Sequence, residues 1–238
     1  MSELDVYLSQ YFFDTEQMAT ACQLPVAELL ALVRERLVPG PSYVVANGTT
    51  LKSYVFGEMA TSGAKDGSYF HPATAVWVER AMQTIAKVGR EQAGVALRAR
   101  FAERMQDALA RLNGSTWRLP DCFAEDGSVI AEGIARRMQS IWAHFIHGTF
   151  GLCVANPVSE ADIARKEVLQ EKLTVLSVNG TRFAYSADEA LAMLDLIDAY
   201  ADSAMPFSPV EYAVSSRKRL VEDLAARIRS ASLFAETA

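Results

Sequence analysis

The chain has 238 residues, of which 50% are hydrophobic and 22% are charged, and its formal net charge is −6. These values are typical of a globular protein with one large or two small cores, and they exclude a largely disordered chain. The acidic balance also argues against a nucleic-acid-binding surface, because affinity for phosphate depends on clustered Lys and Arg.

Two further classes of protein are excluded by the same inspection. No apolar run approaches the roughly 18 to 20 residues that a membrane-spanning helix needs, and the first residues are acidic, unlike a secretory leader. We therefore expect a cytoplasmic protein without a membrane partner. Cys22, Cys122 and Cys153 are odd in number and lack CxxC spacing, so neither a disulfide framework nor a zinc ribbon is indicated.

The segment from Asp14 to Tyr43 has the layout of a helix-turn-helix. Two helical patterns, at 15–22 and 25–36, are separated by a very short turn. Ala19 is small where the two helices would cross, and Leu24 is available for a core. The pattern predicts a helix-turn-helix-like headpiece, with or without a wing.

This headpiece resembles that of the MerR-type regulators in Ala19, Leu24 and the exit Leu37-Val38-Pro39. The resemblance implies a DNA-reading second helix. The chain departs from the family pattern, because Gln23 and Leu29-Leu30-Ala31 stand where the family has Gly and an Arg followed by aromatics. The second helix also lacks the net positive charge that base and phosphate contacts need, because Arg34 and Arg36 are offset by Glu28 and Glu35. DNA is thus an unlikely partner on charge, and we expect the headpiece to contact a second copy of the chain or another protein.

Downstream, one region favours strands and the remainder favours helices. Residues 42–70 are rich in Gly, Ser, Thr and Tyr, which suits a small hairpin or wing. His71-Pro72 begins a long helical pattern that breaks or resumes near Gly89, and another covers 129–147. Capping boxes begin at Ser159, Ser186 and Ser208.

These patterns together predict a mainly α protein: a helix-turn-helix-like headpiece with a wing-like loop at 1–90 and an α-helical bundle at 91–238, with a minor β-hairpin. Asn179-Gly180 is the turn signal expected to join two short strands. Arg98, Arg100 and Arg104 on the helical pattern 92–112 interleave with Glu103 and Asp107, which is typical of a solvated, salt-bridged face.

No phosphate-loop, dinucleotide, zincin or hydrolase motif occurs in the chain. The densest cluster of side chains that could take part in a reaction lies in residues 141–154. His144 and His147 stand three residues apart on one helical face and form the only pair of side chains whose ordinary titration range is near neutral pH. They are the candidates for acid–base catalysis. Histidines beside aromatic residues are more often core residues, and no carboxylate lies in register, so we predict no metal site. Trp142 and Cys153 are the candidate substrate contacts here.

The chain also resembles an uncharacterised family labelled as natural-product biosynthesis proteins of unknown function. The resemblance rests on matches spread over nearly the whole chain: 37–43, Phe56-Gly57-Glu58, Phe70-His71-Pro72, Trp77, Trp142, Phe145, Gly148, Phe150-Gly151, Cys153, Ile163, Lys166-Glu167, 206–209, Ser216-Arg217 and Arg219. It implies a role around a small-molecule pathway and brings with it no activity, cofactor or catalytic residue.

An anionic small molecule is the ligand class that the residues favour. Lys166, Arg217 and Arg219 stand near expected helix starts, where free backbone N–H groups also favour carboxylate or phosphate. The alternative is that these cations pair with acidic residues on exposed helix faces. The cofactor, if there is one, stays unknown.

Three hypotheses follow. The first is a protein of bacterial specialised metabolism that binds or transforms a small anionic amino-acid-like or acyl substrate in a helical pocket; whether it is an enzyme is left open. The second is a ligand-responsive MerR-like regulator, and the third is a non-catalytic partner-binding protein.

Overall fold

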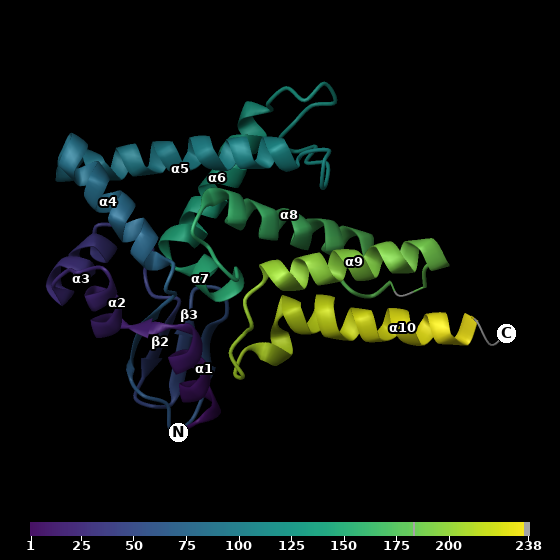
Figure 1. Cartoon of the computed structure of the whole chain (residues 1–238), viewed down its shortest axis with the longest axis horizontal. Coiled ribbons are helices and arrows are strands. Elements are labelled where there is room, and N and C mark those ends of the chain that lie inside the picture. Colours follow the sequence, from purple (N-terminus) through teal and green to yellow (C-terminus); the bar gives the residue numbers. More distant parts are fainter. Residues whose placement is uncertain (183, 236–238) are drawn as a thin grey trace.

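The computed structural model describes residues 1–182 and 184–235 (Figure 1). Within the first seventy residues, short helices alternate with short strands. Their bounds are Glu3–Tyr11 for α1, Phe13–Asp14 for β1, Thr15–Ala21 for α2, Val26–Arg34 for α3, Tyr43–Ala46 for β2, Thr50–Ser53 for β3, Gly57–Ala60 for β4 and Gly67–Phe70 for β5. The helices α2 and α3 lie where the headpiece pattern predicts them, whereas its relation to the MerR type stays a prediction.

The strands form one antiparallel five-stranded sheet in the order β1-β5-β2-β3-β4. This overturns the expected mainly α fold with a minor hairpin. The strands have only two to four residues each, so their side-chain alternation is too short to stand out in the sequence. The edge strand β1 also pairs with β5 across more than fifty intervening residues, as Phe13 opposite Phe70 shows, and no local pattern predicts such a pairing.

The hairpin expected around Asn179-Gly180 is also wrong for the residues that the structure describes. Val178, Asn179 and Gly180 all have positive φ, at 49°, 56° and 84°. Instead of joining strands they end a helix, because Asn179 N donates to Thr174 O and Arg182 N donates to Ser177 O. The chain shows no strand over 177–182 or 184–186; Phe183 lies outside the described residues.

The rest of the chain is helical. The bounds are Thr74–Val88 for α4, Arg90–Leu112 for α5, Ala131–Ile146 for α6, Thr149–Cys153 for α7, Glu160–Leu176 for α8, Ala187–Ser203 for α9, Tyr212–Val214 for the 3₁₀ turn η1, Lys218–Asp223 for the π-helical segment η2 and Leu224–Ala235 for α10. Gly89, with φ of 79°, separates α4 from α5 at the expected break. No helix of the described chain is long and apolar enough to cross a membrane.

Side-chain caps fix two of these helices where the sequence predicts them. The Ser186 hydroxyl accepts from Glu189 N in a complete capping box, and the Ser159 hydroxyl accepts from Asp162 N. The third expected box is incomplete: Glu211 N donates to Ser208 Oγ, but the Glu211 carboxylate accepts from that hydroxyl and not from the Ser208 backbone N–H. The same carboxylate accepts hydrogen bonds from Tyr43 Oη and Ser53 Oγ, both at 2.7 Å, and so ties the C-terminal segment to the sheet.

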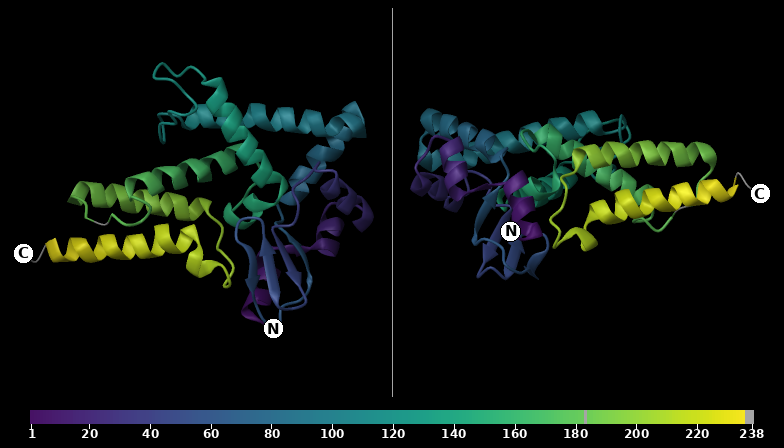
Figure 2. Two further views of the ribbon diagram at one scale, coloured as in Figure 1. Left: turned by 180° about the vertical axis from the view of Figure 1, so that it is seen from behind. Right: turned by 60° about the horizontal axis from the view of Figure 1, so that its bottom comes forward.

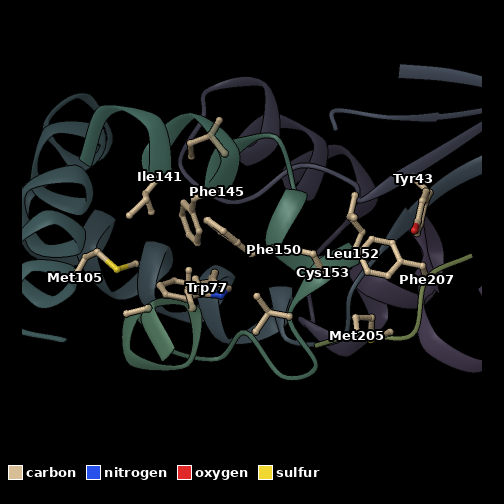
Figure 3. Packing of buried hydrophobic residues seen from close by; sticks show 14 of the residues in the cluster. Tyr43, Trp77, Met105, Ile141, Phe145, Phe150, Leu152, Cys153, Met205 and Phe207 are labelled. Atoms are coloured by element: carbon tan, nitrogen blue, oxygen red, sulfur yellow. The ribbon is translucent and has the colours of Figure 1, made fainter. Parts of the chain in front are cut away.

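The views agree that α8, α9 and α10 run side by side away from the sheet (Figures 1 and 2). The helix α5 contacts α8 on the side opposite to α9. The largest hydrophobic cluster of the described residues connects these parts: Tyr43 of the sheet, Trp77 of α4 and Phe145 of α6 all belong to it (Figure 3). This cluster contains residues from both sides of residue 90. The division into domains at that point stays a prediction.

Two glycines allow the short helix α7 to approach its neighbours closely. A Cβ at Gly151 would lie 2.3 Å from Ser42 Oγ and 2.8 Å from His71 Cβ. A Cβ at Gly148, where φ is 73°, would lie 2.4 Å from Gly40 O. Only glycine permits this approach, and Ser42 Oγ adds a hydrogen bond to Gly148 O at 2.9 Å. We call this contact region the α7 junction.

Gly151→Ala should therefore destabilise the protein by about 2 to 3 kcal/mol, because the added methyl overpacks a buried interface. Gly94→Ala is the matched control: its Cβ would meet only Leu37 Cδ2 at 3.5 Å, in the interior of α5. That change should stabilise by about 0.5 to 1 kcal/mol through helix propensity. Urea denaturation of the three proteins measures both effects, and equal midpoints for the two variants would contradict the tight packing at α7.

Candidate functional site

The structure brings the two predicted catalytic histidines together beside a residue that the sequence did not indicate. The Tyr54 ring, in the turn between β3 and β4, stacks on His147 with 4.1 Å between ring centroids and meets His144 edge-on at 5.3 Å. His147 Nδ1 donates to Ala143 O at 2.7 Å, and His144 Nδ1 lies 3.2 Å from Thr149 Oγ1. In both rings Nε2 is the nitrogen left for proton transfer. The catalytic role stays a prediction.

Cys153 and Lys166 also lie together, in the interior. The Lys166 side chain is 4% exposed, donates to Glu167 Oε1 at 2.9 Å and faces the Cys153 thiol. Burial lowers the pKa of Lys166, but Cys153 and the Glu167 carboxylate outweigh burial and the net shift is upward. Burial raises the pKa of Cys153 to about 11. At neutral pH the pair is thus an ammonium and a thiol, which can hold a polar group but do not supply a thiolate.

The two predicted arginines take different positions near the start of η2. Arg217 Nη1 donates to Ala201 O and Ala204 O, both at 2.9 Å, and so satisfies carbonyls at the C-terminal end of α9. Arg219 lies next to Gly180, and its buried Nε forms no hydrogen bond with the described residues. The substrate-binding roles predicted for Cys153, Lys166, Arg217 and Arg219 stay predictions.

Trp142 is the predicted contact that lies in the wall of a large cavity. A groove of about 430 Å³ runs between α5 and α6. Its lining combines apolar side chains with polar ones at the rim: Phe101, Ala102, Val129, Ala131, Ile134, Ala135, Met138 and Trp142, with Arg98, Glu103, Gln106 and Gln139. We call this cavity the α5–α6 groove.

The groove follows from the sequence of its two helices. On α6, Ile134, Met138 and Trp142 recur every four residues and form one apolar stripe. On α5, Phe101 and Ala102 face this stripe, and the small Ala102 and Ala135 leave the space that larger side chains would fill. At the rim, Arg98 makes no hydrogen bond or ion pair with any described residue. The sequence predicts that Arg98 forms salt bridges with Glu103 or Asp107, and this prediction is wrong for Arg98. A partly apolar cavity of this size with a few free polar groups is suited to a small molecule.

Sequence reasoning found Trp142 but missed Phe101, Met138 and Arg98 as parts of the same site. The stripe spacing on α6 was the available signal, but a stripe by itself predicts core packing equally well. Among the described residues, the structure shows no group of three or more His, Cys, Asp or Glu that could hold a metal ion.

A second cavity lies in the α7 junction, and its volume of about 20 Å³ is the size of one water molecule. Ten of its twelve lining residues are among those that carry the resemblance to natural-product proteins, Thr74 and Pro157 being the exceptions. Its polar groups are satisfied: Trp77 Nε1 donates to Pro157 O at 2.7 Å, and His71 Nδ1 accepts from Ala73 N at 3.0 Å. Packing of the fold therefore accounts for these residues.

The comparisons with known proteins place most of the helical part in one family. A family model described as a family of unknown function, DUF6058, matches residues 97–229, which is more than half of the chain. No curated protein and no solved structure matches the chain.

The buried His71 makes the stability of the protein pH-dependent. Burial lowers the pKa of His71 to about 4, although a hydrogen bond with the Ala155 backbone opposes the shift. Between pH 6.5 and pH 4 the unfolded chain binds a proton at this residue that the folded chain does not bind, so stability is present above pH 6.5 and is lost as the pH falls. We expect a loss of about 2 to 3 kcal/mol between pH 7.5 and pH 4.5.

His71→Asn is the control, because the Asn Oδ1 can replace Nδ1 as the acceptor for Ala73 N–H but does not titrate. The free energy of unfolding, measured in urea at both pH values, should converge for the two proteins at the lower pH. A difference between them that stays constant with pH would contradict a neutral, buried His71.

Proposed function

The chain belongs to DUF6058, a family of unknown function, and we propose that it binds a small molecule with an apolar acyl or aryl body in the α5–α6 groove. All the residues that line the groove, from Arg98 to Trp142, fall within the part of the chain that the family model matches. The groove is the observation that carries the proposal.

Size and chemistry support this choice over the other cavities. The groove measures about 430 Å³, whereas the α7 junction cavity measures about 20 Å³ and holds no more than a water-sized group. Its floor is apolar where Phe101, Ile134 and Met138 meet, so a hydrocarbon or aryl body is the part of a ligand that gains most from burial there. The rim groups Gln106 and Gln139 can donate to or accept from polar substituents.

Trp142 has a particular place in this groove. Its ring lies 5.2 Å from Phe101 and 5.4 Å from Phe145, measured between ring centroids. Phe101 and Phe145 belong to the main hydrophobic core, and Trp142 packs against that core as a partly buried residue. The indole therefore presents a rigid wall to the groove, as expected of an aromatic ligand contact.

A role around a small-molecule pathway of natural-product metabolism, which the sequence resemblance implies, is the biological setting that we propose for this binding. The chain would bind or transform an acyl or amino-acid-like intermediate. His144 lies near the end of α6 and His147 directly follows that helix; neither lines the groove, and we propose them as the acid–base pair for a reacting group that extends beyond it.

The first test uses a series of saturated fatty acids as probes. Each methylene buried in the groove should contribute about 0.8 kcal/mol, so octanoate to decanoate should tighten binding by about fifteenfold. Isothermal titration calorimetry below the micelle concentration measures this dependence. A Kd that does not change with chain length would rule out an apolar groove as the binding site.

Variants locate the binding. Ala135→Gln places a longer side chain in the groove and should weaken decanoate binding by about tenfold or more, as should Trp142→Ala, which removes the wall. Ala99→Gln is the matched control: the same change at another exposed alanine, on α5 outside the groove lining, should leave the Kd unchanged. Equal effects of the two Gln variants would place the probe elsewhere.

A further inference from the structure

A second, smaller depression adjoins the α5–α6 groove on the other side of Trp142. It shares Phe101 and Trp142 with the groove, and the rest of its lining comes from four helices and the segment before the sheet: Trp77 and Arg80 of α4, Leu97 and Arg100 of α5, Phe145 of α6, Glu160 at the start of α8, and Leu37. Its charged lining residues are Arg80, Arg100 and Glu160. Because the two cavities share these two aromatic residues, they are neighbours, and a head group that extends beyond the groove past these rings would meet the charged groups.

Arg80 is held in this depression with one of its donors unused. Its Nη2 donates to Val158 O at 2.9 Å, and its guanidinium lies over the Trp77 ring, 4.5 Å from the centroid. Its buried Nη1 forms an ion pair with Glu160 Oε2 at 3.6 Å, a distance too long for a hydrogen bond, and it makes no hydrogen bond with any described residue. A buried guanidinium N–H in this position is a donor that a ligand oxygen could satisfy.

The local charge balance favours an anion. Arg80 and Arg100 contribute two positive charges to the lining against the single carboxylate of Glu160. Arg100 makes no hydrogen bond or ion pair within the described chain. Burial is the main cause that lowers the pKa of Arg80; Glu160 opposes it, Arg100 and Arg104 add to it, and Glu79 opposes it weakly. The depression therefore carries an excess of positive charge.

We infer that Arg80 and Arg100 bind the carboxylate of a ligand whose apolar body lies in the α5–α6 groove, so that the protein selects amphipathic carboxylic acids over their neutral counterparts. This inference rests on the proposed function and adds its ligand class. The planar forks of two guanidinium groups match a carboxylate.

The test compares two probes that share a chain length and differ in charge. The full-length protein is titrated with decanoate and with 1-decanol. Decanoate should bind about tenfold or more tightly than 1-decanol. Arg100→Gln should reduce this preference to less than about threefold and leave the Kd of 1-decanol unchanged, since the groove itself is intact.

Two further variants make the test specific. Glu160→Gln removes the competing carboxylate and should tighten decanoate binding severalfold without affecting 1-decanol, an effect that a merely structural residue would not produce. Arg98→Gln removes a neighbouring cation that lines the groove and not the depression, and it should leave most of the preference for decanoate in place.

The outcomes separate the two proposals. If both probes bind with the same Kd, or if Arg98→Gln abolishes the preference and Arg100→Gln does not, the carboxylate site at Arg80 and Arg100 is wrong while the groove stands. If neither probe binds the wild-type protein, the proposed function fails and the inference fails with it.

Discussion

The structure depends on the close approach of α7 to the sheet. At Gly151 and Gly148 the helix backbone lies against Ser42, His71 and Gly40 at distances that leave no room for a Cβ. Because only two residues separate the end of α6 from the start of α7, this contact also fixes the direction of α6. The position of Trp142, which lies near the end of α6 that leads into α7, and with it the wall of the α5–α6 groove, thus follows from this packing constraint.

Buried polar groups reinforce the same arrangement from several directions. Tyr7 Oη donates to Pro206 O at 2.7 Å, and Glu211 accepts from Tyr43, Ser53 and Ser208, so the segment before η1 is held on the sheet. Burial raises the pKa of Glu211 despite these three donors. A carboxylate in such a position is costly unless each oxygen has its partner, so the network specifies one arrangement of sheet and helices.

A core is stable when its side chains are closely packed, whereas a binding site needs space for a ligand. Phe101 and Phe145 are buried in the main cluster, but Trp142, which touches both, packs against the core and also borders two cavities. The rigid junction lies on one side of this aromatic group, and the α5–α6 groove with its free rim charges lies on the other. A site at the boundary of a packed core keeps its walls in place while leaving space for a ligand, which is the arrangement that selective binding of a small molecule requires.

The sequence by itself determined most of the longer helices, the caps at Ser159 and Ser186 and the break at Gly89, because hydrophobic spacing and capping act over a few residues. It also indicated Trp142 and paired His144 with His147, since residues three or four apart share a helix face. Only the tertiary structure decided the five-stranded sheet, whose strand β1 pairs with the distant β5, and the hydrogen bond that the Glu211 carboxylate accepts from the Tyr43 hydroxyl. The groove and the Arg80–Arg100 pair were decided in the same way, because they arise where separate helices meet, and the spacing of residues within one helix does not say which other helix it will face.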